Sequence, residues 1–163
     1  MNTAAFWIEH LQLIKHPEGG FYKETYRCSE SLTAPFNQEL RSISTAIYFL
    51  LQEKEVSHFH RIKSDELWFF HEGETLEILV IENNQIHIHL LGKNILQGEQ
   101  LQVIVPAGCW FASRIRSGTN FSLVSCTVAP GFDFQDFELA NREALCSEYP
   151  HLKDLLAPLC IEK

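Results

Sequence analysis

Two histidines one residue apart, followed by an acid, form the segment of this sequence that is best suited to chemistry. The stretch SHFHRIKSDELWFFHEGE spans residues 57–74 and includes His58, His60 and Glu66. Successive side chains of a β-strand point to opposite faces, so both histidines should share a face with Val56. Inward imidazole and carboxyl groups must pair, bind a metal ion or line a cavity, because burying an unpaired charge is costly. The segment predicts either a ligand cavity or a hydrogen-bonded cluster that only stabilises the core.

A second pair of alternating histidines, His87 and His89, provides a comparison within the same chain. The apolar residues Ile86, Ile88 and Leu90 take one face of that expected strand. Both histidines therefore lie on the opposite, more polar face, and no comparable acid follows them. We expect this second pair to face solvent rather than a ligand.

Short β-type stretches make up most of the chain and would position the first segment. They cover residues 21–28, 42–51, 55–61, 66–71, 75–82, 85–91, 100–105, 109–116 and 121–128. Many short strands separated by turns, without helices between them, are typical of an antiparallel sandwich or barrel. Helical spacing of apolar residues predicts a helix over residues 3–14, and proline-interrupted helix formers predict two short helices after residue 134. The sequence thus predicts one all-β domain over residues 1–163 with helices at both ends.

The composition argues against a nucleic-acid partner and a membrane span and favours a cytoplasmic location. Of the 163 residues, 45% are hydrophobic and 21% are charged, which is typical of a globular protein. The formal net charge of -8 repels polyanions, so a nucleic-acid partner is not expected. The longest apolar runs, such as residues 44–51, fall far short of the ~20 residues that span a membrane. Five cysteines without a CxxC pair are expected as buried thiols of a cytoplasmic protein.

Two short motifs resemble the signatures of the cupin superfamily. The first lies at His58, His60, Glu66 and Gly73, and the second is the Pro-x-Gly of VPAGCWFASRI, at Pro106 and Gly108. Phe111 stands where the second motif usually has a histidine. The resemblance implies a double-stranded β-helix, or jelly-roll, barrel, and the missing histidine puts the usual metal site in doubt.

A longer set of blocks is similar to the functionally uncharacterised family called cupin 5. In chain order they are HPEGGFYKETYR, STAIYFLL, SHFHRIKSDELWFFHEG, VPAGCWFA and APGFDFQDFEL, within residues 16–139. This resemblance implies a homodimer of jelly-roll barrels, each with an internal cavity. It implies no particular reaction.

Several further residues are expected to line such a cavity. Tyr48 and Ser44 share the small, polar face of the strand over residues 42–51 and suit a cavity wall next to the histidines. The expected aromatic contacts of a ligand are Trp68, Trp110, Phe111 and Phe132. Glu18, in HPEGG, has two interpretations: it belongs only to a tight turn, or it reaches into the cavity.

Three functions fit these residues. In the first, His60 oriented by Glu66 is a general base and Tyr48 donates or relays a proton, in a metal-free isomerase or epimerase that acts next to a carbonyl. In the second, His58, His60 and Glu66 hold Fe, Mn, Ni or Zn, so the cofactor is either absent or a divalent metal. In the third, the barrel binds or stores a ligand without turnover. We expect a small polar metabolite, such as a carbohydrate derivative, to be the ligand.

Overall fold

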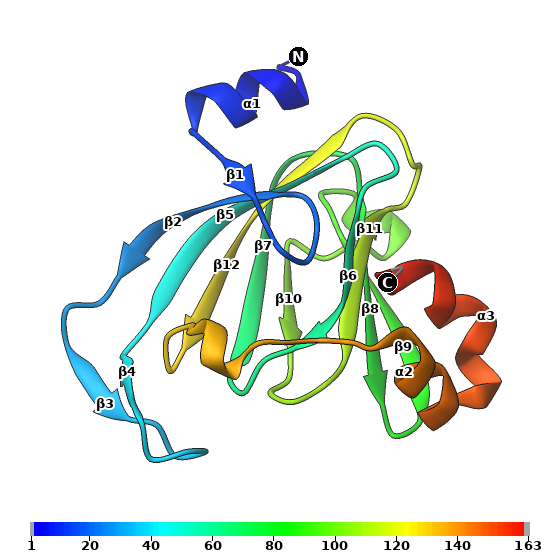
Figure 1. Cartoon of the computed structure of the whole chain (residues 1–163). Helices are drawn as coiled ribbons and strands as arrows, with labels where there is room; N and C mark the ends of the chain where they lie inside the picture. Colours follow the sequence, from blue (N-terminus) through cyan, green and yellow to red (C-terminus); the bar gives the residue numbers. More distant parts are fainter. Residues whose placement is uncertain (1, 162–163) are drawn as a thin grey trace.

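Two antiparallel β-sheets form the body of the protein in a computed structural model that describes residues 2–161 (Figure 1). The larger sheet has the order β1-β2-β5-β12-β7-β10, with β1 at Ile14–Lys15, β2 at Phe21–Arg27, β5 at Thr45–Gln52, β12 at Phe121–Ala129, β7 at Asp65–Gly73 and β10 at Gln102–Val105. The smaller sheet has the order β13-β6-β11-β8-β9, with β13 at Glu138–Leu139, β6 at Val56–Arg61, β11 at Phe111–Ile115, β8 at Leu76–Glu82 and β9 at Gln85–Leu91. A hairpin of β3 (Ser31–Thr33) and β4 (Leu40–Ser42) stands apart from both. The predicted all-β barrel is confirmed.

The main core lies between the two sheets and contains side chains from both. Phe49 and Trp68 of the larger sheet pack there with Ile78, Val80 and Phe111 of the smaller one. Strand β8 is apolar on both faces because each face is covered. Its alternate residues belong to a second cluster, on the outer side of the smaller sheet.

Short helices at the end of the chain cover that outer side. They are α2 (Arg142–Glu148) and α3 (Lys153–Leu156), accompanied by 3-10 turns at Pro150–Leu152 and Ala157–Leu159. Leu145 and Leu156 are fully buried against Phe59 and Leu79 of the sheet. Two further 3-10 turns lie at Ile95–Gln97 and Phe134–Asp136. The helices expected near the C-terminus are confirmed.

The N-terminal helix α1 is shorter than its apolar spacing predicts. It spans Ala4–His10, and the Thr3 hydroxyl caps it by accepting the Phe6 N–H at 3.2 Å. Gln12 then has a φ of 56°, which ends the helix, and Ile14 pairs with Tyr22 in the sheet. No helix within the described range is long and apolar enough to cross a bilayer.

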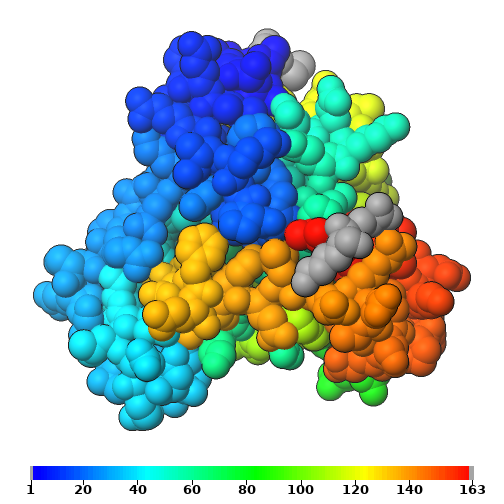
Figure 2. All heavy atoms as spheres, viewed as in Figure 1, coloured from blue at the N-terminus to red at the C-terminus, as the bar shows by residue number. Residues whose placement is uncertain are grey.

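A connecting segment, here called the strap (residues 130–137), crosses from the larger sheet to the smaller one (Figure 1). At its start the Gly131 N–H donates to the Ser42 carbonyl, and the Phe132 N–H donates to the Thr45 hydroxyl at 2.9 Å. At its end the chain enters β13, which pairs with β6. The strap is part of the surface seen in Figure 2, below the N-terminal residues in blue. It therefore closes one side of the space between the sheets.

Candidate functional site

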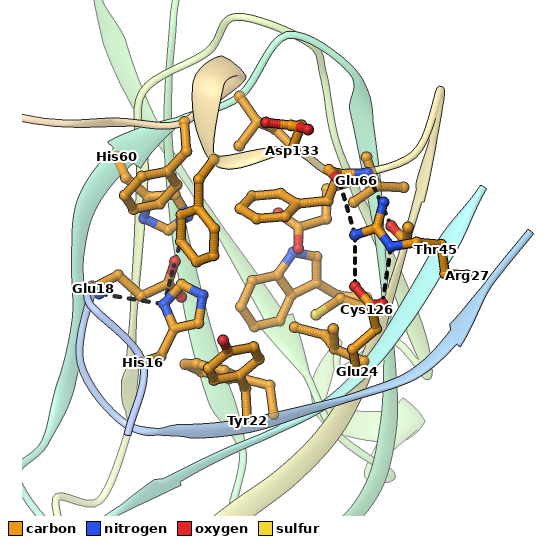
Figure 3. A pocket seen from close by; sticks show the side chains of 18 residues that line it. His16, Glu18, Tyr22, Glu24, Arg27, Thr45, His60, Glu66, Cys126 and Asp133 are labelled. Carbon is orange, nitrogen blue, oxygen red and sulfur yellow. Dashed lines mark hydrogen bonds and ion pairs between the residues drawn. The ribbon is translucent and has the colours of Figure 1, made fainter. Parts of the chain in front are cut away.

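A cavity of about 270 Å³ lies between the sheets beneath the strap (Figure 3). The larger sheet supplies most of its walls, the smaller sheet supplies His60, and the strap supplies three phenyl rings. Its polar lining consists of His16, Glu18, Glu24, Arg27, Thr45, His60, Glu66, Cys126 and Asp133, and its aromatic lining of Tyr22, Phe49, Trp68, Phe132, Phe134 and Phe137. Mostly apolar walls with a few convergent polar groups are typical of a small-molecule site.

Glu18 is the centre of a buried polar group. Its Oε2 lies 3.1 Å from Nε2 of His60 and 3.3 Å from Nδ1 of His16. Its other oxygen, Oε1, accepts a hydrogen bond of 2.8 Å from the Ser57 hydroxyl. In Figure 3 this group occupies one side of the cavity, opposite the Glu24–Arg27 pair.

The turn that carries Glu18 is held tightly against strand β6. The Glu18 carbonyl accepts both the His58 N–H, at 2.8 Å, and Nδ1–H of the same histidine, at 2.7 Å. Gly19 follows with a φ of 113°, and a Cβ added there would lie 2.1 Å from the Val56 carbonyl oxygen. Only glycine fits this close approach, and the close approach directs the Glu18 side chain inward.

The hydrogen bonds of His60 fix where its protons lie. Its Nδ1 is 2.7 Å from the His58 carbonyl, which can only accept, so Nδ1 carries a proton. A neutral ring then has a bare Nε2, and the 3.1 Å contact with Glu18 requires one proton between them. Burial lowers the pKa of His60 to about 4 and raises the pKa of Glu18. The shared proton therefore resides on Glu18, next to an uncharged His60 ring.

His16 extends this arrangement by one more proton site. The Glu18 N–H donates to its Nδ1 at 3.2 Å, so the neutral ring carries its proton on Nε2. Burial also lowers the pKa of His16, which keeps the ring uncharged. Both contacts with Glu18 are made by Nδ1, so Nε2–H is the donor that this ring can offer within the cavity lining.

Glu66 is a second buried acid in the same cavity. It is 8% exposed, and burial raises its pKa to about 8, with Glu18 acting in the same direction whenever that group is ionised. Cys126 and Trp68 act in the opposite direction by stabilising its anion. The Trp68 Nε1 is fully buried and has no acceptor at hydrogen-bond geometry among residues 2–161. Glu66 is thus mostly protonated at pH 7 and ionises just above it.

A charged pair lies on the opposite side of the cavity. Arg27 donates to both carboxylate oxygens of Glu24, at 2.9 and 2.7 Å, and also to the Phe132 carbonyl at 3.1 Å. Both side chains of the pair are about two-fifths exposed. This pair connects β2 to the strap.

The strap is also anchored by a buried ion pair. Arg41 donates to both carboxylate oxygens of Asp136, through Nε at 2.6 Å and Nη2 at 3.1 Å. The Asn37 side chain donates to the same carboxylate at 3.1 Å. The β3–β4 hairpin thereby fixes the strap in place over the cavity.

Five of the residues expected at the site from the sequence line the cavity. They are Glu18, His60, Glu66, Trp68 and Phe132. The interpretation of Glu18 as part of a turn alone is wrong, because its side chain contacts His16, His60 and Ser57.

His58 is expected beside His60 but does not line the cavity. Strand β11 pairs Phe111 with His60 and Ser113 with Ser57, so three steps along β6 match two along β11. This β-bulge shifts the alternation, so Ser57 rather than His58 joins His60 at the Glu18 carboxyl group. The three groups expected to share a metal, His58, His60 and Glu66, are not assembled.

The cavity wall on strand β5 is the face opposite to the expected one. Thr45, Ile47 and Phe49 line the cavity, whereas Tyr48 packs with the cluster beneath α1. Ser44 has the same parity as Tyr48 and is likewise not part of the lining. The small, polar face was expected inside, but α1 covers that face from the outside.

Trp110 and Phe111 also lie outside the lining. Trp110 belongs to the outer cluster, and the guanidinium of Arg61 stacks 4.3 Å from its ring. Phe111 is fully buried in the main core, with its ring centre 4.1 Å from that of His60. It supports His60 from behind rather than contacting the cavity.

Several lining residues were not anticipated from the sequence. His16 precedes Glu18 in the same HPEGG block, and its proximity to Glu18 was the available signal. Thr45 and Cys126 come from central strands whose inward face is set only by packing. Phe137 follows a run of strap aromatics, and nothing local indicates that it turns inward to contact His60.

The residues present do not fit a cupin-type metal ion. Within the described part of the chain, no group of three or more His, Cys, Asp or Glu side chains is placed to hold one. Phe111 occupies the place of the second-motif histidine, and Nε2 of His60 already contacts Glu18. The groups in the cavity that can carry out chemistry are therefore its own side chains.

Comparison with known proteins gives a family match and several close structures. A model of the family described as Cupin superfamily (DUF985), Cupin_5, matches residues 5–140. The uncharacterized protein YML079W of Saccharomyces cerevisiae is 32% identical, over 93% of this chain and 79% of its own length.

Two solved structures are similar over nearly their whole length. A hypothetical protein from Leishmania major has a TM-score of 0.93 at 36% identity, covering 99% of this chain and 100% of its own. Protein SO0799 from Shewanella oneidensis has a TM-score of 0.91 at 41% identity, with both chains fully covered. Oxalate decarboxylase of Bacillus subtilis shares only the fold, with a TM-score of 0.57 at 13% identity over 91% of this chain and 37% of its own.

Proposed function

This chain belongs to the Cupin_5 family of the cupin superfamily, and on that premise we propose that its cavity binds a small polar metabolite and moves a proton next to a carbonyl. One observation carries the proposal. Glu18 and His60 share a proton across 3.1 Å inside a cavity that also contains Glu66, with a pKa of about 8. Paired titratable groups with divergent pKa values are the arrangement that acid–base catalysis requires.

Glu66 is the general base in this proposal. Its pKa lies close to the working pH, so the ionised form is accessible and still basic enough to take a proton from carbon. Because the site is buried, that carboxylate is poorly solvated and correspondingly reactive.

The His16–Glu18–His60 group is the proton donor. The neutral His16 ring presents Nε2–H, and Glu18 holds a second proton against His60. A carbonyl oxygen that gains negative charge as its neighbouring carbon loses a proton would be stabilised by such donors. Return of the proton to the opposite face of the same carbon gives epimerisation. If that carbon bears a hydroxyl, delivery of the proton to the former carbonyl carbon, with loss of the hydroxyl proton, gives isomerisation instead.

The cavity volume supports a small ligand. At about 270 Å³ it lies just below the roughly 300–1,000 Å³ of drug-sized sites. Aromatic walls suit the flat, apolar faces of a sugar-like ring, so a carbohydrate derivative is the proposed substrate class.

Solvent deuterium exchange tests this proposal. Small aldoses, ketoses and amino sugars are incubated with the protein in D₂O, and proton NMR follows the signal next to the carbonyl. We expect exchange with at least one compound, and a loss of about 100-fold or more in Glu66→Gln and in Glu18→Gln. Binding without any exchange would reject catalysis and leave a binding or storage module.

A further inference from the structure

The charges that line the cavity are unbalanced. Among the described residues that form it, four bear carboxyl groups, namely Glu18, Glu24, Glu66 and Asp133, and only Arg27 bears a permanent positive charge. The guanidinium of Arg27 is already engaged by both oxygens of Glu24 and by the Phe132 carbonyl. A phosphate or carboxylate ligand would find no free cation in this lining.

The aromatic walls favour the opposite sign of ligand charge. Six lining residues are aromatic, and the faces of such rings attract cations. Trp68 is two residues from Glu66 on β7, so the largest ring and the buried acid lie on the same face of the strand. Aromatic ring faces together with an excess of carboxyl groups in one cavity favour an ammonium group over an anion.

Within residues 2–161, no Lys, Arg or His side chain forms an ion pair with Glu66. Its nearest polar neighbours are the carboxyl of Glu18, the thiol of Cys126 and the indole of Trp68. Because no cation pairs with it, the Glu66 carboxyl group is kept neutral by its own proton. A ligand cation at this place would let the proton leave and would hold the carboxylate ionised.

We infer that the substrate is an α-amino carbonyl compound, such as a 2-amino-2-deoxy sugar, whose ammonium group binds beside Glu66. This inference rests on the proposed function and specifies its substrate class. The same cation that is recognised converts Glu66 into the carboxylate that the reaction needs. The carbon that carries the ammonium group also carries the hydrogen to be removed, so recognition and chemistry involve adjacent atoms.

The proton transfers balance in this scheme. The C–H bond breaks, its proton goes to the Glu66 carboxylate, and its electron pair forms the C=C bond of an enol. The carbonyl oxygen takes a proton from the His16–Glu18–His60 group. The reverse transfers restore the carbonyl, with the hydrogen on the same or the other face of the carbon.

Calorimetry with matched pairs of compounds tests the inference. The probes are D-glucosamine against D-glucose, and cyclohexylamine against cyclohexanol, at pH 6.5 in phosphate and in imidazole buffer. We expect each amine to bind about tenfold more tightly than its neutral partner. The difference between buffers should show release of close to one proton per amine bound, because Glu66 ionises.

Two variants locate the effect. Gln resembles the protonated carboxyl group, so Glu66→Gln should retain neutral ligands but lose both the preference for amines and the proton release. Glu72→Gln, on the same strand as Glu66 but outside the cavity lining, should keep both. Transfer of the effect to Glu72→Gln would overturn the assignment to Glu66.

Other outcomes are equally decisive. Equal or tighter binding of the neutral partners, absence of proton release, or absence of binding by every amine would each overturn the inference. Deuterium exchange into a neutral sugar together with any of these results would leave the proposed function standing. Amine binding with proton release but no exchange of any substrate would instead support the ligand class and reject the reaction.

Discussion

Nε2 of His60 lies 3.1 Å from Oε2 of Glu18, on a ring whose other nitrogen donates to the His58 carbonyl. The two side chains therefore behave as one unit that holds a single proton between them. The turn at Gly19 and the bulge in β6 set this contact, so it depends on backbone geometry as much as on the two residues.

The pH at which His60 becomes charged is the first testable property of this unit. His60 should remain neutral down to a pH of about 4, as NMR titration of its ring signals would show. Between pH 6.5 and 4 the unfolded chain binds a proton that the native ring does not, so the free energy of unfolding falls as pH falls. His60→Asn should remove this part of the acid dependence. A native ring that titrates near 6.5 would contradict the buried neutral pair.

Glu66 should make the free energy of unfolding depend on pH on the alkaline side of the range. Its native pKa is about 8 against an ordinary value of 4.5, so between these values the unfolded chain loses a proton that the native chain keeps. The free energy of unfolding therefore decreases as pH rises through this range and levels off above about 8.

Glu66→Gln tests the pH dependence of stability that is assigned to Glu66. The variant should be more stable than the parent at pH 8 by on the order of 1–3 kcal/mol, with a smaller difference at pH 5. Denaturant unfolding at the two pH values measures it. An equal difference at both would show that Glu66 is ionised in the native cavity.

Gly19 should be irreplaceable for steric reasons. Gly19→Ala places a Cβ 2.1 Å from the Val56 carbonyl oxygen at a φ of 113°, so the turn must move and Glu18 must leave the cavity. We expect a loss of several kcal/mol of stability and loss of ligand binding. Gly98→Ala is the matched control, because Gly98 also has a positive φ but no atom lies within 4 Å of the added Cβ. That control should cost only about 1 kcal/mol.

The strands were predictable because their signals are local. Alternating apolar residues and turn residues between them identify strands such as β8 and β9, whose bounds agree with the expected stretches to within a residue. Which face of a strand points inward cannot be predicted from such local signals, because it depends on the elements that cover each face of the sheet. Strand β5 has α1 on one side and the cavity on the other, and its own sequence does not indicate which.

The residues of the candidate site were likewise predictable only where strand alternation alone determines their position. His60 and Glu66 were expected in the cavity, and they are there, because alternation places them on the correct face. His58 was misplaced because a β-bulge changes the alternation, and the bulge is set by pairing with a strand about 50 residues later. Glu18 reaches the site only through packing of its turn on β6, which no local pattern encodes.

Tyr48 provides a test of the corrected strand face. Because it packs beneath α1 and its hydroxyl is not part of the cavity, Tyr48→Phe should leave ligand binding and deuterium exchange unchanged. Thr45→Val on the opposite face should weaken binding, since it removes the hydroxyl that accepts the Phe132 N–H. Isothermal calorimetry on both variants makes the comparison. A large loss in Tyr48→Phe would restore the original assignment of this face.

The buried pair of Arg41 and Asp136 should control the mobility of the strap. Arg41→Met leaves the Asp136 carboxylate with its Asn37 contact but without its charged partner, and a buried unpaired charge is strongly unfavourable. The strap should then open more often, and amide hydrogen exchange over residues 131–137 should accelerate by about tenfold or more. Arg61→Met removes an ion pair with Glu138 at the end of the same segment, but both partners there are largely exposed, so little change is expected. Equal acceleration of exchange in the two variants would mean that the strap is held by its phenyl rings rather than by the buried pair. Faster exchange in Arg41→Met alone, together with weaker ligand binding, would show that this pair keeps the cavity closed.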